Sequence, residues 1–132
     1  MNRAGQEPRV GQLFTHLDAR GGLGVAESSD VPFIPRRFFW LFGVMNGETR
    51  ANHGHRECEQ FVFVQYGSVR GFTLDSAGSR FDFSLGVADY LYVPVRHWLQ
   101  LSDFSPDAII GVLASHSFNA DEYIDSPLEL DT

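Results

Sequence analysis

The sequence contains no lysine, and all ten of its basic residues are arginine. Schiff-base catalysis needs a primary amine, so the absence of lysine excludes that chemistry from every side chain and leaves only the N-terminus. Any anionic group that the chain binds must be held by arginine, whose guanidinium suits bidentate contacts with phosphate.

Cysteine is almost absent as well. Cys58 is the only one, which excludes a disulfide within the chain and a zinc site built from cysteines. There is also no run of 18 apolar residues, and the first eight residues lack the apolar core of a signal peptide. We therefore expect a cytoplasmic protein without a membrane partner.

The charge balance is acidic, with a formal net charge of −7. A nucleic-acid partner normally requires a basic face, so we expect none. With 132 residues, 43% of them hydrophobic and 12 of them Phe, the chain should form one packed domain over residues 1–132. Residues 1–11 are polar and contain Gly and Pro, which predicts a loose lead-in.

Short apolar segments separated by Gly, Pro and Asp turns predict an all-β sandwich or barrel. Residues 31–35 contain two prolines and should be extended but not helical. Asn119 to Ile124 is the one segment with a helical pattern, and Asn119 is its expected N-cap. The expected strands are 12–16, 23–27, a buried aromatic strand over 37–44, a strand carrying two histidines, 61–65, 68–74, 79–85, 90–93, 97–101 and 108–115.

The histidine strand carries His53 and His55, with Arg50 and Arg56 on either side. Residues i and i+2 of a strand project from one face, so both imidazoles should point into the same space. Imidazole suits proton transfer because its unperturbed pKa lies near neutrality. The alternative is that both are incidental polar residues on a strand.

The spacing around this pair resembles the first motif of the cupin jelly roll, a double-stranded β-helix, and a second cupin-like segment follows at Gly86 and Pro94. Metal-binding cupins usually have Glu where this chain has Gln60 and a further His where it has Leu99. Two histidines alone make a poor site for a divalent metal, so we expect no metal. The residues of the first motif are Gly47, His53, His55, Gln60 and Gly67.

A longer ordered set of short segments runs through the chain: Asp18-x-Arg20-Gly21-x-Leu23, Glu27, Val31-Pro32-Phe33, Arg37, Arg50-x-x-His53-x-His55-Arg56, Gln60, Gly67-Ser68, Pro94, Trp98, Phe104-Ser105, Val112-Leu113-Ala114-Ser115 and Asp121-Glu122-Tyr123-Ile124. This set resembles the dTDP-4-keto-6-deoxyglucose 3,4-ketoisomerases, the WxcM-like (FdtA-type) sugar-nucleotide isomerases. The resemblance covers roughly residues 18–124.

The resemblance implies a cupin jelly roll with a short C-terminal helical turn. It implies a homodimer, metal-free and without a cofactor, that exchanges N-terminal strands, with residues 12–27 the expected exchanged segment. Its partner would be a dTDP-linked keto-deoxysugar, whose keto group moves from C4 to C3 through an enediol. His53 and His55 become the acid/base pair, without a decision on which acts at carbon. The expected substrate-binding residues are Arg50, Arg20, Arg37, Phe39, Arg56, Gln60, Arg96 and Trp98.

One departure from the family pattern concerns Phe39, which stands where the family often has tyrosine. A missing hydroxyl favours a first alternative, a non-catalytic cupin that binds a nucleotide sugar. A second alternative is a metal-dependent cupin enzyme. Trp98 has packing as its own alternative, and Tyr123 is expected to pack and not to take part in chemistry.

Overall fold

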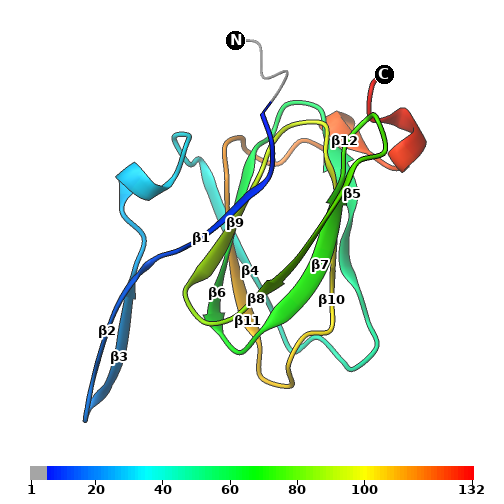
Figure 1. Ribbon diagram of the computed structural model, residues 1–132. Coiled ribbons are helices and arrows are strands. Elements are labelled where there is room, and N and C mark those ends of the chain that lie inside the picture. The colour runs from blue at the N-terminus through cyan, green and yellow to red at the C-terminus, as the bar shows by residue number, and fades with distance from the viewer. Residues whose placement is uncertain (1–5) are drawn as a thin grey trace.

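The computed structural model describes residues 6–132 and consists of two five-stranded antiparallel sheets that face one another, with a two-stranded hairpin projecting to one side (Figure 1). Within the described residues the helical elements are three short 3-10 turns, Ser28–Asp30 (η1), Ala120–Glu122 (η2) and Pro127–Glu129 (η3). The prediction of an all-β chain is confirmed.

The first sheet has the strand order β1-β9-β6-β11-β4. Its central strand β6 is apolar on both faces, because one face meets the second sheet and the other is covered by the N-terminal segment through Leu13 and Val31. The strands are β1 (Arg9–Gln12), β9 (Asp89–Val93), β6 (Gln60–Tyr66), β11 (Ile109–Ala114) and β4 (Arg37–Phe42).

The second sheet has the order β12-β5-β10-β7-β8. Strand β7 alternates buried and more exposed side chains, as expected for a sheet with one face on the core. The strands are β12 (Tyr123–Ile124), β5 (Arg50–His55), β10 (Trp98–Ser102), β7 (Val69–Leu74) and β8 (Arg80–Leu85). The residues that fill the space between the sheets are Val62, Val64, Val69, Phe83, Leu85, Leu91, Val93, Leu99, Leu101, Ala108, Ile110 and Val112.

The N-terminal region corrects one prediction. Residues 9–12 are not a loose lead-in but strand β1, which pairs with β9, because backbone pairing at a sheet edge needs no apolar pattern. Residues 1–5 of that lead-in lie outside the described part of the chain. Strands β2 (Phe14–Asp18) and β3 (Gly21–Val25) form the projecting hairpin, close to the ranges expected.

Strand β4 is not uniformly buried, contrary to the prediction for residues 37–44. Its exposure alternates, so that Phe39 and Leu41 face the core while Phe38, Trp40 and Phe42 are exposed. The aromatic residues on both faces hid this alternation in the sequence. The strand lies at the edge of the first sheet and pairs on one side only, with β11.

The C-terminal segment closes one end of the second sheet. Asn119 caps η2 by accepting a hydrogen bond from Asp121 N, and the chain then forms β12, which pairs Tyr123 with His55. The helical pattern over 119–124 thus corresponds to one 3-10 turn followed by a strand. Residues 6–132 include no helix that is both long and apolar enough to cross a membrane.

Candidate functional site

A cavity of about 330 Å³ lies between the edge strand β4 and strand β5. Five of the residues singled out in the sequence line it, namely Arg37, Phe39, Arg50, His53 and Gln60. The rest of the wall is mainly apolar and consists of Trp40, Leu41, Ala51, Leu99, Leu101, Val112 and Tyr123. An apolar wall with a few convergent polar groups is typical of a small-molecule site.

A break in strand regularity directs His53 into this cavity. Ala51 and Asn52 have positive φ angles of 70° and 61°, and the register between β5 and β10 shifts at this point. The Asn52 side chain holds the irregular segment by accepting a hydrogen bond from Gln100 Nε2 at 2.8 Å and donating one to Thr49 Oγ1 at 3.0 Å. Such left-handed residues outside glycine cost roughly 1–3 kcal/mol each and cluster at functional sites.

The two imidazoles lie together, as the i, i+2 spacing predicted. Their ring centroids are 4.9 Å apart with nearly perpendicular planes. The ring of Tyr123 packs against both, with centroid distances of 4.7 Å to His53 and 4.4 Å to His55. His53 faces the cavity, whereas His55 is only 3% exposed and lies behind it.

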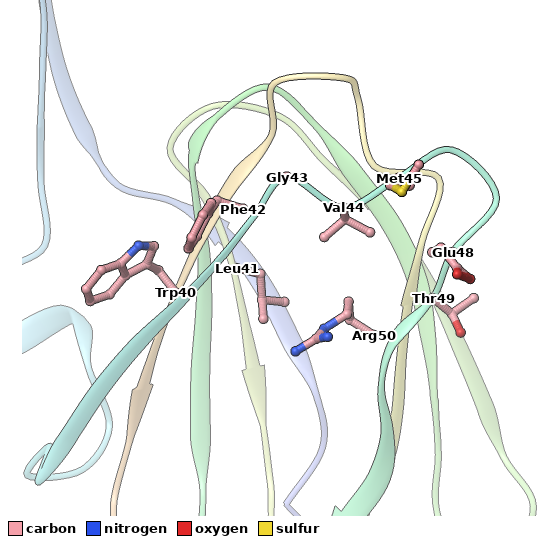
Figure 2. A pocket seen from close by; sticks show the side chains of 9 residues that line it. All are labelled: Trp40, Leu41, Phe42, Gly43, Val44, Met45, Glu48, Thr49 and Arg50. Carbon is pink, nitrogen blue, oxygen red and sulfur yellow. The ribbon is translucent and has the colours of Figure 1, made fainter.

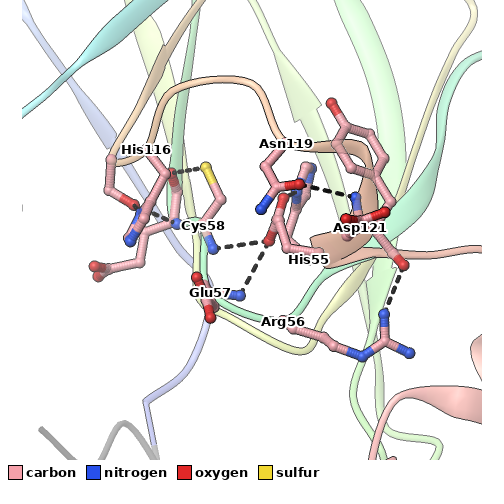
Figure 3. A network of polar contacts seen from close by, with 11 residues as sticks. His55, Arg56, Glu57, Cys58, His116, Asn119 and Asp121 are labelled. Carbon is pink, nitrogen blue, oxygen red and sulfur yellow. Dashed lines mark hydrogen bonds and ion pairs between the residues drawn. The ribbon is translucent and has the colours of Figure 1, made fainter.

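A buried carboxylate stands behind His55. Glu122 is 6% exposed, and its Oε2 is bonded to His55 Nδ1. Its Oε1 accepts hydrogen bonds from the backbone N–H of Glu57 at 3.0 Å and of Cys58 at 3.1 Å. Figure 3 shows this network around His55, beside the Asn119 cap that begins η2.

Burial changes the pKa values of His53, His55 and Glu122. It lowers the pKa of His53 to about 4, with a further lowering by the neighbouring His55. Burial also lowers the pKa of His55, against a smaller raising effect of the Glu122 hydrogen bond. For Glu122, burial raises the pKa, but the hydrogen bonds from His55, Glu57 and Cys58 together outweigh it and keep the pKa below its usual value. At neutral pH both imidazoles are therefore neutral and the carboxylate is ionised.

Among residues 6–132, buried side-chain nitrogen or oxygen atoms without a hydrogen-bond partner occur at three places, and all belong to this site. They are Arg37 Nε, His53 Nδ1 and His55 Nε2. Arg37 and His53 line the cavity, and His55 packs against His53 behind it. Buried polar atoms are normally paired, so these unpaired nitrogens indicate groups arranged for a ligand. The Arg37 guanidinium lies over the rings of Phe39 and Phe118, at 5.4 and 5.8 Å from their centroids.

A second cavity, of about 390 Å³, adjoins the first along the end of β4 (Figure 2). Arg50, at the start of β5, lines both cavities, as do Trp40 and Leu41. In Figure 2 the Arg50 side chain extends from β5 toward Leu41 on β4. A guanidinium at the junction of two cavities can hold an anionic group that connects a ligand's two halves.

Three buried residues behind the cavity carry atoms of the types that ligate metals. In the described part of the chain, His55, Cys58 and Glu122 bring ligand atoms within 4.8 Å of one another. Both carboxylate oxygens of Glu122 already accept hydrogen bonds. At the two cupin ligand positions, the cavity wall carries the amide of Gln60 and the alkyl side chain of Leu99. Gln60 and Leu99 therefore do not complete, with the two histidines, the three-ligand set of a catalytic metal.

Four of the residues expected to bind substrate do not line the cavity. Arg20 lies on the exposed hairpin and pairs with Asp18 at 2.7 Å. Arg56 donates to the Tyr123 carbonyl, and Arg96 donates to the C-terminal carbonyls of Leu130 and Thr132. Trp98 is 9% exposed and packs with Ile124 and Leu130. The sequence spacing could not separate these packing and tethering roles from ligand contact.

Two residues at the site were missed as functional candidates. Tyr123 was expected to pack only, yet it lines the cavity. Glu122 was noticed only as part of a family segment. The available signal is the capped turn itself, because Glu122 is the third residue after the Asn119 cap and Tyr123 follows it directly.

Comparison with known proteins gives consistent results. A model of the WxcM-like, C-terminal family (FdtA) matches residues 6–130. The TDP-4-oxo-6-deoxy-alpha-D-glucose-3,4-oxoisomerase of Aneurinibacillus thermoaerophilus is 33% identical over 110 residues, covering 82% of this chain and 78% of that relative.

Solved structures include close matches to the fold. A 3,4-ketoisomerase from Helicobacter canadensis superposes with a TM-score of 0.85 at 25% identity and covers 94% of both chains. A TDP-quinovose 3,4-ketoisomerase from Campylobacter jejuni has a TM-score of 0.85 at 27% identity, over 95% of this chain and 97% of that one.

Proposed function

The chain belongs to the WxcM-like, C-terminal family, and on that premise we propose that it is a sugar-nucleotide 3,4-ketoisomerase. Its substrate is a dTDP-4-keto-6-deoxyhexose and its product the 3-keto isomer. The observation that carries the proposal is the pair of neutral imidazoles with unpaired ring nitrogens: His53 lines an arginine-bearing cavity, and His55 lies directly behind it.

The reaction needs only proton transfers. An imidazole removes the proton from C3, and the electron pair of that C–H bond forms a C3–C4 double bond while the C4 carbonyl oxygen takes a proton. The resulting enediol loses the proton of its C3 hydroxyl, the C3 carbonyl forms, and C4 takes a proton. No electron acceptor is required, so two positioned imidazoles are sufficient for the chemistry, each such group contributing roughly 10²–10⁴-fold in rate.

The other polar groups of the cavity have complementary tasks. Arg37 and Arg50 are the cavity arginines, and they stabilise the enediolate charge or hold the pyrophosphate. Gln60, which is buried, offers its amide to a sugar hydroxyl. Trp40 in the adjoining cavity offers a face on which a thymine base can stack.

We propose further that the two facing sheets are a cupin jelly roll and that catalysis is independent of metal and cofactor. Support for the first comes from the sequence motif around His53 and from the likeness to the two ketoisomerase structures. Support for the second comes from Gln60 and Leu99, which supply no charged or imidazole ligand.

The proposed active form is a homodimer in which N-terminal strands are exchanged. Hairpin β2-β3 is a separate two-stranded sheet, and Phe14, Leu17 and Leu23 on it are exposed. An isolated hairpin is marginally stable in water, so a second copy is the natural cover for these side chains. A substrate contact by Arg20 requires the hairpin of one subunit to reach the cavity of the other.

The proposal is tested by incubating the purified protein with dTDP-4-keto-6-deoxyglucose, with and without EDTA, and following the sugar by NMR. Formation of a 3-keto sugar at the same rate in both samples is expected. Line broadening of intact substrate would instead identify a non-catalytic nucleotide-sugar binder, and loss of activity in EDTA would identify a metal-dependent enzyme.

A further inference from the structure

We propose that Glu122 is a positioning residue for the reaction. It holds His55 in the tautomer that carries its proton on Nδ1, so that Nε2 is the nitrogen that exchanges a proton. This inference rests on the proposed ketoisomerase function and adds a third residue to the acid/base machinery.

The hydrogen bonds around the Glu122 carboxylate determine which ring nitrogen of His55 carries the proton. Glu122 Oε1 accepts from two backbone N–H groups, of Glu57 and Cys58, and Oε2 faces His55 Nδ1. An ionised carboxylate is an acceptor only, so the imidazole must donate from Nδ1. The other ring nitrogen, Nε2, is then the unprotonated one, and it is without a partner among the described residues.

The position of the carboxylate is set by elements outside the cavity. Its two backbone donors belong to the turn between β5 and β6, while Glu122 itself ends η2, whose first turn is capped by Asn119. Backbone N–H dipoles already aimed at the carboxylate require no rearrangement during turnover. Glu122 therefore fixes the orientation of the His55 ring as well as its tautomer.

The two imidazoles differ in whether a hydrogen-bond partner fixes their tautomer. His53 Nδ1 is buried without a hydrogen-bond partner in residues 6–132. No carboxylate of the described residues is hydrogen-bonded to His53, whereas His55 is held by one. A carboxylate that orients a histidine also stabilises the imidazolium formed when Nε2 accepts a proton, as in the catalytic triads. This asymmetry makes His55 the member of the pair whose protonated form is stabilised during turnover.

The test uses Glu122→Gln in the full-length protein. The amide oxygen should keep the two backbone donors, which forces the amide NH₂ toward His55 and reverses the tautomer. Two-dimensional ¹⁵N NMR of the imidazoles, assigned with His55→Asn, should show protonated Nδ1 in the wild type and protonated Nε2 in the variant. We expect kcat to fall roughly 10²–10⁴-fold with a small change in KM. Asp121→Asn removes the same charge from the adjacent exposed residue and should retain wild-type kcat.

Protonated Nε2 on His55 in the wild type would overturn the proposal even if Glu122→Gln failed to fold. So would an unchanged tautomer, or wild-type kcat, in a folded Glu122→Gln variant. Failure of the ketoisomerase function itself is distinguishable, because the wild type would then be inactive while its imidazole spectrum would still report the tautomer.

Discussion

Tyr123 on β12 is the cross-strand partner of His55 on β5, and its ring packs against the imidazoles of both His55 and His53. A two-residue strand near the C-terminus therefore forms part of the wall around the two imidazoles. Tyr123 and Phe39 both line the cavity, so the site contains a phenol although position 39 lacks the tyrosine that the family often has.

This packing predicts that the ring of Tyr123 matters more than its hydroxyl. Tyr123→Ala should lower kcat because both imidazoles lose the surface that orients them, and it should destabilise the fold by about 2–4 kcal/mol. Tyr123→Phe keeps the ring and should retain most of the activity. Steady-state kinetics and urea unfolding of the two variants make the comparison. Equal losses of kcat in both would assign the effect to the hydroxyl.

Removal of either histidine should slow turnover by roughly 10²–10⁴-fold, but the two variants should differ in stability. His55→Ala leaves the buried Glu122 carboxylate without one of its donors, which costs about 1–3 kcal/mol beyond the lost packing. His53→Ala removes a ring whose Nδ1 has no hydrogen-bond partner within residues 6–132. Urea unfolding should therefore rank His55→Ala as the less stable. The reverse ranking would contradict the role given to the Glu122 bond.

The stability of the protein should fall in acid because His53 is buried in its neutral form. Its pKa is lowered to about 4 by burial and by His55, from 6.5 for an ordinary histidine. The unfolded chain takes up the proton first, so the stabilisation is complete above about pH 6.5 and is lost as the pH falls toward about 4, by up to about 3 kcal/mol.

The measurement is urea unfolding of the wild type and of His53→Asn across this pH range. The variant lacks the titrating group. The difference in free energy of unfolding between the wild type and the variant should therefore shrink as the pH falls. A difference that stays constant with pH would show that His53 does not titrate with a lowered pKa.

The exposed apolar residues of hairpin β2-β3 predict that charge placed there will separate the proposed dimer. Leu17→Glu with Leu23→Glu should shift the protein from dimer to monomer in light scattering after size exclusion. Ser76→Glu adds charge at an exposed position in the turn between β7 and β8, away from the hairpin, and serves as the control. A wild-type protein that is monomeric, or a double variant that remains dimeric, would contradict the exchange of these strands.

Local sequence patterns predicted most strands and the shared face of His53 and His55, because strand alternation and turn residues are local signals. The residues that surround the two histidines are brought there by contacts between distant parts of the chain. Glu122 lies 67 residues from His55, and only the pairing of β12 with β5 brings Tyr123 to the imidazoles. The positive φ angles at Ala51 and Asn52 were also invisible, since neither is a glycine.

The arginines illustrate the same limit. The sequence indicates five arginines as ligand candidates, Arg20, Arg37, Arg50, Arg56 and Arg96, yet of these only Arg37 and Arg50 line the cavity. Arg96 is bonded to carbonyls of the C-terminal segment instead. A side chain with five donors can tether a terminus as readily as it can bind phosphate, and the sequence does not distinguish these uses.

The most direct test of His-mediated proton transfer is NMR of the reaction in D₂O, with the wild type beside His53→Ala and His55→Ala. We expect the wild type to form the 3-keto sugar with deuterium at C4, and both variants to lose exchange and turnover together. A 3-keto product without solvent deuterium, or wild-type exchange in both variants, would contradict proton transfer through these two imidazoles.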